Sequence, residues 1–228
     1  KKYVKSILVI DDLADREHNC DVLLDQNWFG IETIGRYDNL LPNDCTRLLG
    51  PDFALLSKGY TTARKKKKVH KGQIKRILIF MGGVDSGKQT VEALTALCLE
   101  ELKYVSVDVV IGNSNKDLSK IMNIASNRKN TVVHKLLPNL VELMMNADLM
   151  LCTGGSTTWE RCCLGLPAIV VIAAKNQSKF TKLLAKDGVH LLLDSSKKND
   201  REDWFVKVRE LACDSDKVKE MSTLSSNL

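Results

Sequence analysis

The sequence predicts an α/β protein built around a parallel β-sheet. From about residue 75 onward, short and continuous apolar runs alternate with amphipathic segments. Strands that are apolar on both faces are typical of a sheet that helices cover on each side. Two of the apolar runs end in glycine pairs, MGG at 81–83 and CTGGST at 152–157. Glycine at a strand end lets a ligand approach the backbone closely, so these two places are candidate binding sites.

Each apolar run is assigned to a strand and the segment after it to a helix. The expected strands lie at 76–82, 105–112, 131–136, 148–155, 168–173 and 190–194. The expected helices lie at 86–102, about 116–127, 139–147, 156–165 and 176–188, and the remainder is expected to be mostly helical. Short βα connections of this kind give right-handed crossovers and a Rossmann-like domain, in which ligands bind at the carboxyl ends of the strands.

Residues 1–60 are expected to be the end of a second α/β domain whose earlier part lies upstream. Strands are expected at 5–12 and 20–27, and 38–56 is expected to be a surface segment that leads away from them. Strands this short bury little apolar surface by themselves. The expected division is therefore the end of a first domain at 1–60, a basic linker at 61–75 and a Rossmann-like, nucleotide-binding domain at 76–228.

The composition is that of an ordinary soluble globular protein, with 44% hydrophobic and 27% charged residues. No apolar run approaches the roughly 20 residues of a membrane span. The seven cysteines include no C-x-x-C pair, which favours free thiols in a reducing cytoplasm over disulfides or a zinc site. We therefore expect a cytoplasmic protein without a metal or another cofactor. Its oligomeric state is not predicted.

The positive charge is concentrated in the stretch ARKKKKVHKGQIKR, residues 63–76, which contains eight Lys or Arg residues. One interpretation is a surface for nucleic acid or anionic membrane. The other is a solvated linker before a buried strand. No aromatic residue lies between the charges, so bases would have no side chain on which to stack. We favour the linker and expect no nucleic-acid partner.

The stretch RILIFMGGVDSGKQT, residues 76–90, resembles a P-loop because four residues separate Gly82 from Gly87 and Lys88 follows. A P-loop needs Ser or Thr directly after that lysine to hold magnesium, and Gln89 stands there instead. Lys88 is therefore expected to be a solvated helix residue. Gly82 and Gly83 either let a phosphate approach the backbone near a helix N-terminus or form a plain tight turn, and both alternatives stay open.

The stretch CTGGSTTWERCCLGLPAIVV, from residue 152, places Gly154 and Gly155 at the end of another strand. Thr157 and Glu160 have the spacing of a capping box, in which the glutamate serves only the helix. Alternatively, the Glu160 carboxylate accepts hydrogen bonds from the vicinal hydroxyls of a ribose. Two glycine-rich strand ends in one sheet, one for diphosphate and one for ribose, would make a nucleotide site that needs no metal.

These motifs resemble the GT-B type nucleotide-sugar enzymes, including the glycosyltransferase that forms lipid II. They are more closely similar to UDP-sugar hydrolases of the pseudaminic acid pathway. The matching pieces, in chain order, are VIDDLADREHNCDVLLDQN, LLGPDFALL, MGGVD, NLVELMMNADLMLCTGGSTTWE and LGLPAIVV followed by KNQ. The resemblance implies hydrolysis of a UDP-linked 2,4-diacetamido-2,4,6-trideoxyhexose to free sugar and UDP. The alternatives are a UDP-sugar-dependent glycosyltransferase and a non-catalytic nucleotide-sugar binding module.

The resemblance also implies which residues would hold a UDP-sugar in the cleft. The UDP would be bound by two glycine-rich strand ends, by a helix and by backbone around a leucine pair: Gly82, Gly83, Leu136, Leu137, Gly155, Ser156, Thr157 and Glu160. Within this set the glycines, Ser156 and Thr157 would face phosphate, Glu160 the ribose and the leucines the uracil. Asn176 and Gln177 would contact sugar or phosphate.

The resemblance does not supply a general base. In that family a glycine-rich turn with a histidine opens the first domain, and no such turn occurs here. None of the four histidines, His18, His70, His134 and His190, follows glycine in the required way. The catalytic residue is therefore unassigned, with Asp12 and His18 as candidates on the first-domain part. Asp11 and Asp12 follow a strand, and they either face the sugar or serve only as a helix cap and as solvated charges.

Overall fold

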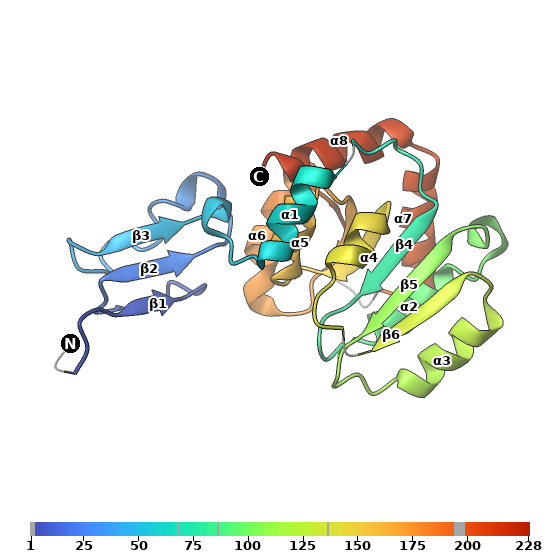
Figure 1. Ribbon diagram of the computed structural model, residues 1–228, viewed down its shortest axis with the longest axis horizontal. Coiled ribbons are helices and arrows are strands. Elements are labelled where there is room, and N and C mark those ends of the chain that lie inside the picture. Colours follow the sequence, from blue (N-terminus) through green and yellow to red (C-terminus); the bar gives the residue numbers. More distant parts are fainter. Residues whose placement is uncertain (1–2, 68, 86, 136, 194–198) are drawn as a thin grey trace.

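The structure is a computed structural model that describes residues 3–67, 69–85, 87–135, 137–193 and 199–228. It contains a three-stranded sheet and a six-stranded sheet, and all strand pairs are parallel. Figure 1 shows the small sheet, in blue, standing to one side of the larger unit. The α/β class with parallel sheets, predicted from the sequence, is confirmed.

The six-stranded sheet has the order β6-β5-β4-β7-β8-β9. Its strands are β4 (Arg76–Phe80), β5 (Ser106–Ile111), β6 (Thr131–Lys135), β7 (Leu149–Thr153), β8 (Ala168–Val171) and β9 (Leu191–Leu192). In order of appearance this is 3-2-1-4-5-6, the strand order of the Rossmann fold. The chain therefore reverses its direction across the sheet between β4 and β7, and a crevice forms outside the carboxyl ends of these two strands.

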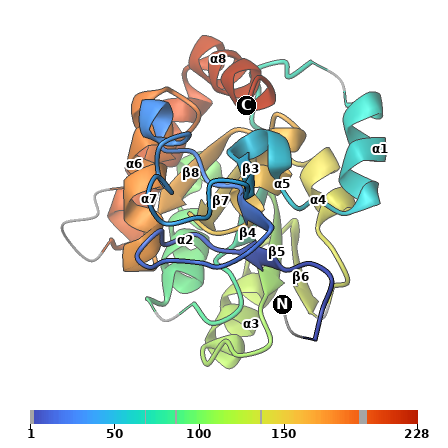
Figure 2. The same cartoon turned by 90° about the vertical axis from the view of Figure 1, so that its left-hand side faces the viewer.

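Helices cover both faces of this sheet because successive side chains of its strands point to opposite sides. Ile77 and Ile79 pack with α2 (Gln89–Ala96), α3 (Leu118–Asn127) and α7 (Arg201–Ala212). Leu78 packs toward α1 (Lys58–Lys66) and α4 (Val141–Asn146). Figure 2 shows α1 and α4 at the right and α2 and α7 at the left. The remaining helices are α5 (Thr157–Cys163), α6 (Ser178–Lys186) and α8 (Ser215–Ser226).

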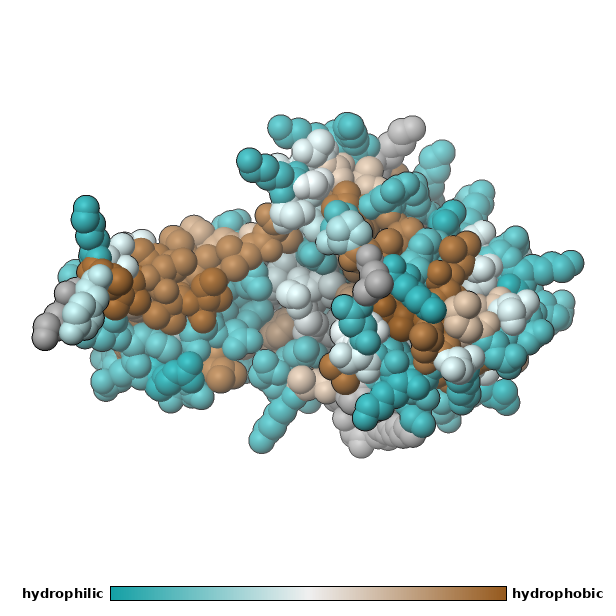
Figure 3. All heavy atoms as spheres, turned by 60° about the horizontal axis from the view of Figure 1, so that its bottom comes forward, coloured by the Kyte–Doolittle hydropathy of each residue, from teal (hydrophilic) through white to brown (hydrophobic). Residues whose placement is uncertain are grey.

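The small sheet consists of β1 (Leu8–Ile10), β2 (Val22–Asp25) and β3 (Thr46–Leu49). Its core includes Leu23 and Tyr37, both fully buried. Apolar side chains on β1 are exposed on the other side, with Leu8 at 57% and Ile10 at 62%. Figure 3 shows brown, hydrophobic atoms across this part of the molecule. The described part of the chain therefore leaves one apolar face of this sheet open.

Two elements differ from the sequence-based expectation. β3 lies within 38–56, which we expected to be a surface segment, because its four residues TRLL show little apolar pattern and only pairing with β2 defines them as a strand. α1 extends into the segment expected to be a linker. Tyr60 and Ala63 bury one side of α1, while its lysines stay in solvent. In this region a short apolar stripe is hidden among basic residues.

One segment after β2 joins the small sheet to the larger unit. Phe29 is buried and packs edge-on to Phe180 of α6, with ring centroids 6.4 Å apart. Trp28 donates from Nε1 to Asp187 Oδ2 at 3.2 Å. Lys179 pairs with Glu32. None of the helices in the described ranges combines the length and the apolar character that crossing a bilayer requires.

Candidate functional site

Two neighbouring pockets lie at the carboxyl ends of the strands. The first, of about 460 Å³, extends from the loop after β4 to the end of β8 and includes Gly82, Gly83 and Thr153. The second, of about 410 Å³, lies between the small sheet and the loop after β7. Gln177 lines both pockets, so they adjoin at this side chain. Their volumes fall in the range of about 300–1,000 Å³ that is usual for small-molecule sites.

The glycines of the two loops differ in what would happen if a side chain replaced their hydrogen atom. A Cβ atom on Gly83 would meet nothing within 4 Å, and one on Gly155 would meet only Gln177 Nε2, at 3.7 Å. Gly82 has a φ of +79°, which favours glycine. Gly154 is required by packing, because a Cβ there would lie 2.3 Å from Thr181 Oγ1. Gly83 and Gly155 thus present bare backbone at the two strand ends, where a ligand can approach it.

The N-terminus of α2 is already occupied by a side chain of its own loop. Asp85 accepts hydrogen bonds from the backbone N–H groups of Gln89, at 2.8 Å, and Thr90, at 3.0 Å. Lys88 points to Asp117, with 3.8 Å between the charged atoms, and is largely exposed. The helix therefore begins at Gln89 and not at residue 86 as expected. Its first N–H groups serve a carboxylate of the protein, which is unlike a P-loop.

The N-terminus of α5 has no such cap. Ser156 occupies the capping position, and no side chain accepts a hydrogen bond from the first turn. The capping box that the spacing of Thr157 and Glu160 suggested is therefore not formed. The Thr158 and Trp159 N–H groups donate to the carbonyls of Gly155 and Ser156, at 3.0 and 3.1 Å, whereas those of Ser156 and Thr157 have no partner within the described part of the chain. Since helix N-termini favour anions, these two N–H groups are candidate donors to a negatively charged group in the crevice.

Glu160 lies half-buried on the side of α5 that faces α1. Burial raises the pKa of its carboxyl group. The hydroxyl of Tyr60 lies close to this carboxylate, and burial together with the charge of Glu160 raises the pKa of Tyr60. The Tyr60 hydroxyl is buried and has no hydrogen-bond partner among the described residues. Glu160 is thus free of a capping role, and its carboxylate can accept hydrogen bonds from a ligand.

The structure brings most of the predicted residues to the paired pockets. Those that line them are Asp12, Gly82, Gly83, Gly155, Ser156, Asn176 and Gln177. Thr157 adjoins Ser156 in the first turn of α5, whereas Glu160 and Leu137 line neither of these two pockets. Leu136 lies outside the described residues. Asn176 Nδ2 is 3.4 Å from Asp12 Oδ2, which links the two sides of the second pocket.

A polar network behind the second pocket was not anticipated. The Tyr37 hydroxyl lies 3.0 Å from Asp11 Oδ2 and 3.2 Å from Asp25 Oδ2. Arg36 Nε lies 3.2 Å from Asp25 Oδ2. Burial raises the pKa of Asp25. Burial also acts to raise that of Asp11, but hydrogen bonds from the Ala14 N–H and from Tyr37 outweigh it, and the pKa of Asp11 is lowered. The sequence feature that could have indicated this network is an aspartate at the carboxyl end of each of two strands, Asp11 after β1 and Asp25 in β2.

Three of the four histidines have structural partners away from the crevice. His134 Nε2 lies 2.8 Å from Asp108 Oδ1. His70 accepts from the Gly72 N–H and donates to the Asp148 carbonyl, and His190 lies between Arg161 and the Thr181 carbonyl. His18 Nε2 is buried, 3.6 Å from Asp11 Oδ2, but lines neither crevice pocket. Among these histidines, only His18 adjoins a residue of the crevice.

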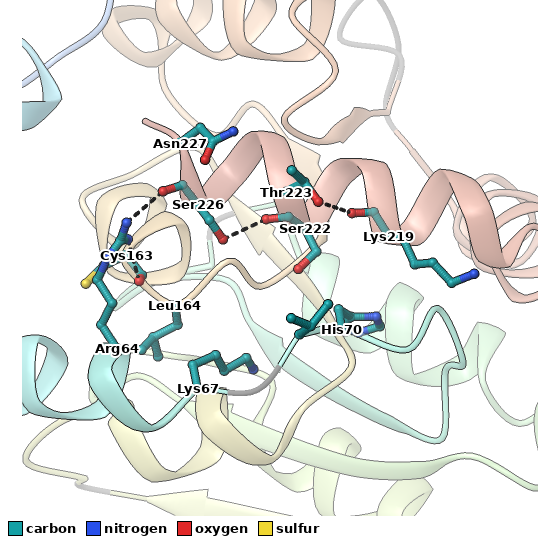
Figure 4. Close-up of a pocket in the computed structure, with 11 residues that line it drawn as sticks. Arg64, Lys67, His70, Cys163, Leu164, Lys219, Ser222, Thr223, Ser226 and Asn227 are labelled. Atoms are coloured by element: carbon teal, nitrogen blue, oxygen red, sulfur yellow. Dashed lines mark hydrogen bonds between the residues drawn. The ribbon is translucent and has the colours of Figure 1, made fainter.

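A basic pocket of about 540 Å³ lies between α1, α5 and α8 (Figure 4). Arg64 donates to the carbonyl oxygens of Cys163, at 2.9 Å, and Ser226, at 2.8 Å. This arginine therefore joins the C-terminal ends of two helices to α1, which satisfies carbonyl groups that helix ends leave unpaired. His70 is bonded just before β7, so the pocket lies at the amino ends of the strands, away from the expected ligand side.

One family model matches the larger unit, and curated relatives match part of the chain. The model of the glycosyltransferase family 28 C-terminal domain matches residues 77–227. The spore coat polysaccharide biosynthesis protein SpsG of Bacillus subtilis strain 168 is 23% identical over 143 residues, which cover 62% of this chain and 42% of SpsG. The chain spans less than half the length of the curated relatives it matches.

Solved structures share the fold over most of the chain. MurG of Acinetobacter baumannii superimposes with a TM-score of 0.61 at 18% identity, over 90% of this chain and 61% of MurG. UGT2 of Phytolacca americana, in complex with UDP-2-fluoro-glucose and pterostilbene, gives 0.58 at 14% identity, over 91% of this chain and 47% of that chain. At these identities the likeness shows a GT-B-like fold. With a match to two thirds of its length, the chain belongs to the glycosyltransferase family 28 C-terminal domain family.

Proposed function

We propose that this chain binds a UDP-sugar in the crevice between the ends of β4 and β7, as the donor-binding part of a glycosyltransferase-type enzyme. The observation that carries this proposal is the pair of bare backbone positions, Gly83 and Gly155, on either side of the point where the strand order reverses. Open α/β sheets bind their ligands at that point. The family match supports transfer chemistry on the same fold.

In this proposal the diphosphate lies over Gly83 and Gly155 and receives hydrogen bonds from the uncapped first turn of α5. Glu160 accepts hydrogen bonds from the ribose hydroxyls, and the backbone near Leu137 meets the uracil. Asn176 and Gln177 lie where the sugar begins. The UDP-2-fluoro-glucose held by the Phytolacca neighbour supports a uridine nucleotide as the ligand class. The protein is proposed to work in the cytoplasm.

Hydrolysis of a UDP-linked diacetamido sugar, which the sequence motifs suggest, is the competing proposal. The two reactions share the departure of UDP and differ in the nucleophile, which is water in one and an acceptor hydroxyl in the other. Asp12 is exposed at the second pocket, and its carboxylate could take a proton from either nucleophile. The family to which the chain belongs favours the acceptor hydroxyl.

Titration calorimetry with UDP tests the proposed site. Gly83→Ala and Gly155→Ala add a methyl group where the protein leaves space, so they should weaken UDP at least about 10-fold while the melting temperature changes little. Gly35→Ala, in the turn region between β2 and β3, is the control and should bind like the wild type. Wild-type affinity in both crevice variants would refute the site. Product analysis with a UDP-sugar then distinguishes free sugar from a transferred one.

A further inference from the structure

We propose that Tyr60 is a positioning residue for the ribose of the bound nucleotide: its hydroxyl donates to the Glu160 carboxylate and holds it toward the ribose hydroxyls. This inference rests on the nucleotide-sugar function proposed above, in which Glu160 accepts hydrogen bonds from ribose. Tyr60 belongs to α1, the helix that extends into the segment expected to be a linker. α1 would therefore serve ligand binding as well as packing.

α1 and α5 pack against each other, and Tyr60 and Glu160 lie at their interface. Arg64 of α1 donates to the carbonyl oxygen of Cys163 of α5 at 2.9 Å, which joins the C-terminal ends of the two helices (Figure 4). Tyr60 precedes Arg64 by four residues, and Glu160 precedes Cys163 by three. Residues at these spacings lie on the same face of a helix, one turn apart. The contact between the helix ends therefore brings Tyr60 and Glu160 together one turn earlier.

The Tyr60 hydroxyl is buried without a hydrogen bond. Only 1% of Tyr60 is exposed, and its ring belongs to a core cluster with Leu78 and Leu140. The hydroxyl lies close to the Glu160 carboxylate but has no hydrogen-bond partner within the described part of the chain. An unpaired buried hydroxyl costs free energy, and such groups are nearly always paired. A phenylalanine would fill the space of the ring without that cost, so the hydroxyl points to a role beside the carboxylate.

A carboxylate can serve Tyr60 and ribose at the same time. Its two oxygens accept several hydrogen bonds. One oxygen of Glu160 can accept from the Tyr60 hydroxyl while the other accepts from ribose. A carboxylate held in this way loses less freedom when the ligand binds. Since the 2′-hydroxyl distinguishes ribose from deoxyribose, Tyr60 should strengthen the preference for UDP over 2′-deoxy-UDP.

Tyr60 also favours the ionised form of Glu160. Burial raises the pKa of the Glu160 carboxyl group, and the neighbouring Tyr60 hydroxyl acts to lower it. Tyr60 itself stays protonated, because burial and the charge of Glu160 raise its own pKa. Tyr60→Phe leaves in place the other charged or titratable side chains of α1, α4 and α5, which are Lys58, Arg64, Lys65, Lys66, Glu142, Arg161, Cys162 and Cys163.

Titration calorimetry with UDP and 2′-deoxy-UDP at several pH values measures both effects. The wild type should bind UDP about 10-fold more tightly than 2′-deoxy-UDP, and Tyr60→Phe should reduce this ratio to about threefold. The rise of UDP affinity with pH should move to higher pH in Tyr60→Phe, because Glu160 loses the donor that lowers its pKa. The titration of the UDP phosphates is common to both proteins and cancels in the comparison.

Two controls separate positioning from structure. The melting temperature of Tyr60→Phe should not fall, since the variant keeps the ring and removes an unpaired hydroxyl. Tyr104→Phe removes the hydroxyl of a tyrosine that is 59% exposed and should bind both nucleotides like the wild type. In a Glu160→Gln background, Tyr60→Phe should have no further effect on UDP affinity. An equal loss in both backgrounds would overturn the positioning role, as would a wild-type ratio and pH profile in Tyr60→Phe.

Absence of UDP binding in the wild type would instead refute the proposed function. Chemical denaturation at several pH values then tests the pair of residues without a ligand. The stabilisation from the Glu160 carboxyl group, measured against Glu160→Gln, is lost as the pH rises through its raised pKa. In the Tyr60→Phe background this loss should occur at higher pH. Such a shift would support the contact between Tyr60 and Glu160, and an unchanged interval would refute it.

Discussion

The carboxylate of Asp85 accepts a hydrogen bond from the backbone N–H of Gln89, four residues later, at 2.8 Å. This contact closes the N-terminus of α2 to a phosphate, although the sequence around it resembles a P-loop. The nearby α5 has no capping side chain. We therefore propose that α5, and not α2, donates to the diphosphate.

Lys88→Ala should leave the affinity for UDP within about twofold of the wild type. Lys88 lies near Asp117 on the surface, and no metal site accompanies it in our proposal. Titration calorimetry with and without a chelator measures both points. Loss of binding in the chelator, or with the Lys88 variant, would restore the P-loop interpretation.

Asp85→Ala should lower the free energy of unfolding by about 0.5–2 kcal/mol, the usual cost of losing a helix cap. Asp85 holds two backbone N–H groups that would then be left to solvent. Chemical denaturation measures the change, and Asp52→Ala, an aspartate on the small-sheet side, serves as the control. An unchanged unfolding free energy would show that the cap contributes nothing.

Glu160→Gln should weaken UDP by about 1.5–3 kcal/mol, the contribution of hydrogen bonds to a charged group. Its effect on the melting temperature should be small, since no capping box is formed. Calorimetry and thermal unfolding are measured on the same preparation. A lower melting temperature with unchanged UDP affinity would make Glu160 a structural residue only.

The pH dependence of UDP binding should also depend on Glu160. Its pKa is raised by burial, so the folded protein prefers the protonated form. The stabilisation that this carboxyl group contributes is fully present below the ordinary pKa of a glutamate, about 4.3. It is lost as the pH rises through the higher pKa that the group has in the folded protein. UDP affinity should rise over the same interval, because the ionised carboxylate is the better acceptor. In Glu160→Gln both trends should disappear; their persistence would assign them to another group.

Asp108→Asn should destabilise the larger unit by about 1.5–3 kcal/mol. Burial acts to raise the pKa of Asp108, but hydrogen bonds from Arg76 and His134 outweigh it and the pKa is lowered. The stabilisation from the Asp108 carboxylate is therefore fully present above the ordinary pKa of an aspartate, about 3.9. It is lost as the pH falls through the lower pKa that the group has in the folded protein. Denaturation at several pH values should show the difference from wild type vanish in acid.

Phe29→Ala should loosen the attachment of the small sheet. Phe29 is buried against Phe180, and the Arg36 guanidinium lies 3.6 Å from the centre of its ring. Removing such a side chain typically costs about 3–5 kcal/mol. Limited proteolysis between residues 26 and 45 should accelerate. Ile31→Ala, in the same segment and 96% exposed, should be cleaved at the wild-type rate.

The sequence predicted the larger sheet well because its strands are continuous apolar runs, as in β4 and β7. It did not reveal β3, whose strand identity depends on pairing with β2. It also did not reveal that Tyr37 connects Asp11 and Asp25, since these residues are distant in the chain and meet only in three dimensions.

The attachment of the small sheet bears on how such proteins can be recombined. Trp28, Glu32 and Asp12 find their partners in a single stretch of the larger unit, residues 176–187. A chimera that exchanges residues 1–56 with those of a homologue would keep its interface only if this stretch is exchanged with them. The practical crossover boundaries for module shuffling thus lie on both sides of η4 (Lys175–Gln177) and α6, far along the chain from the small sheet itself.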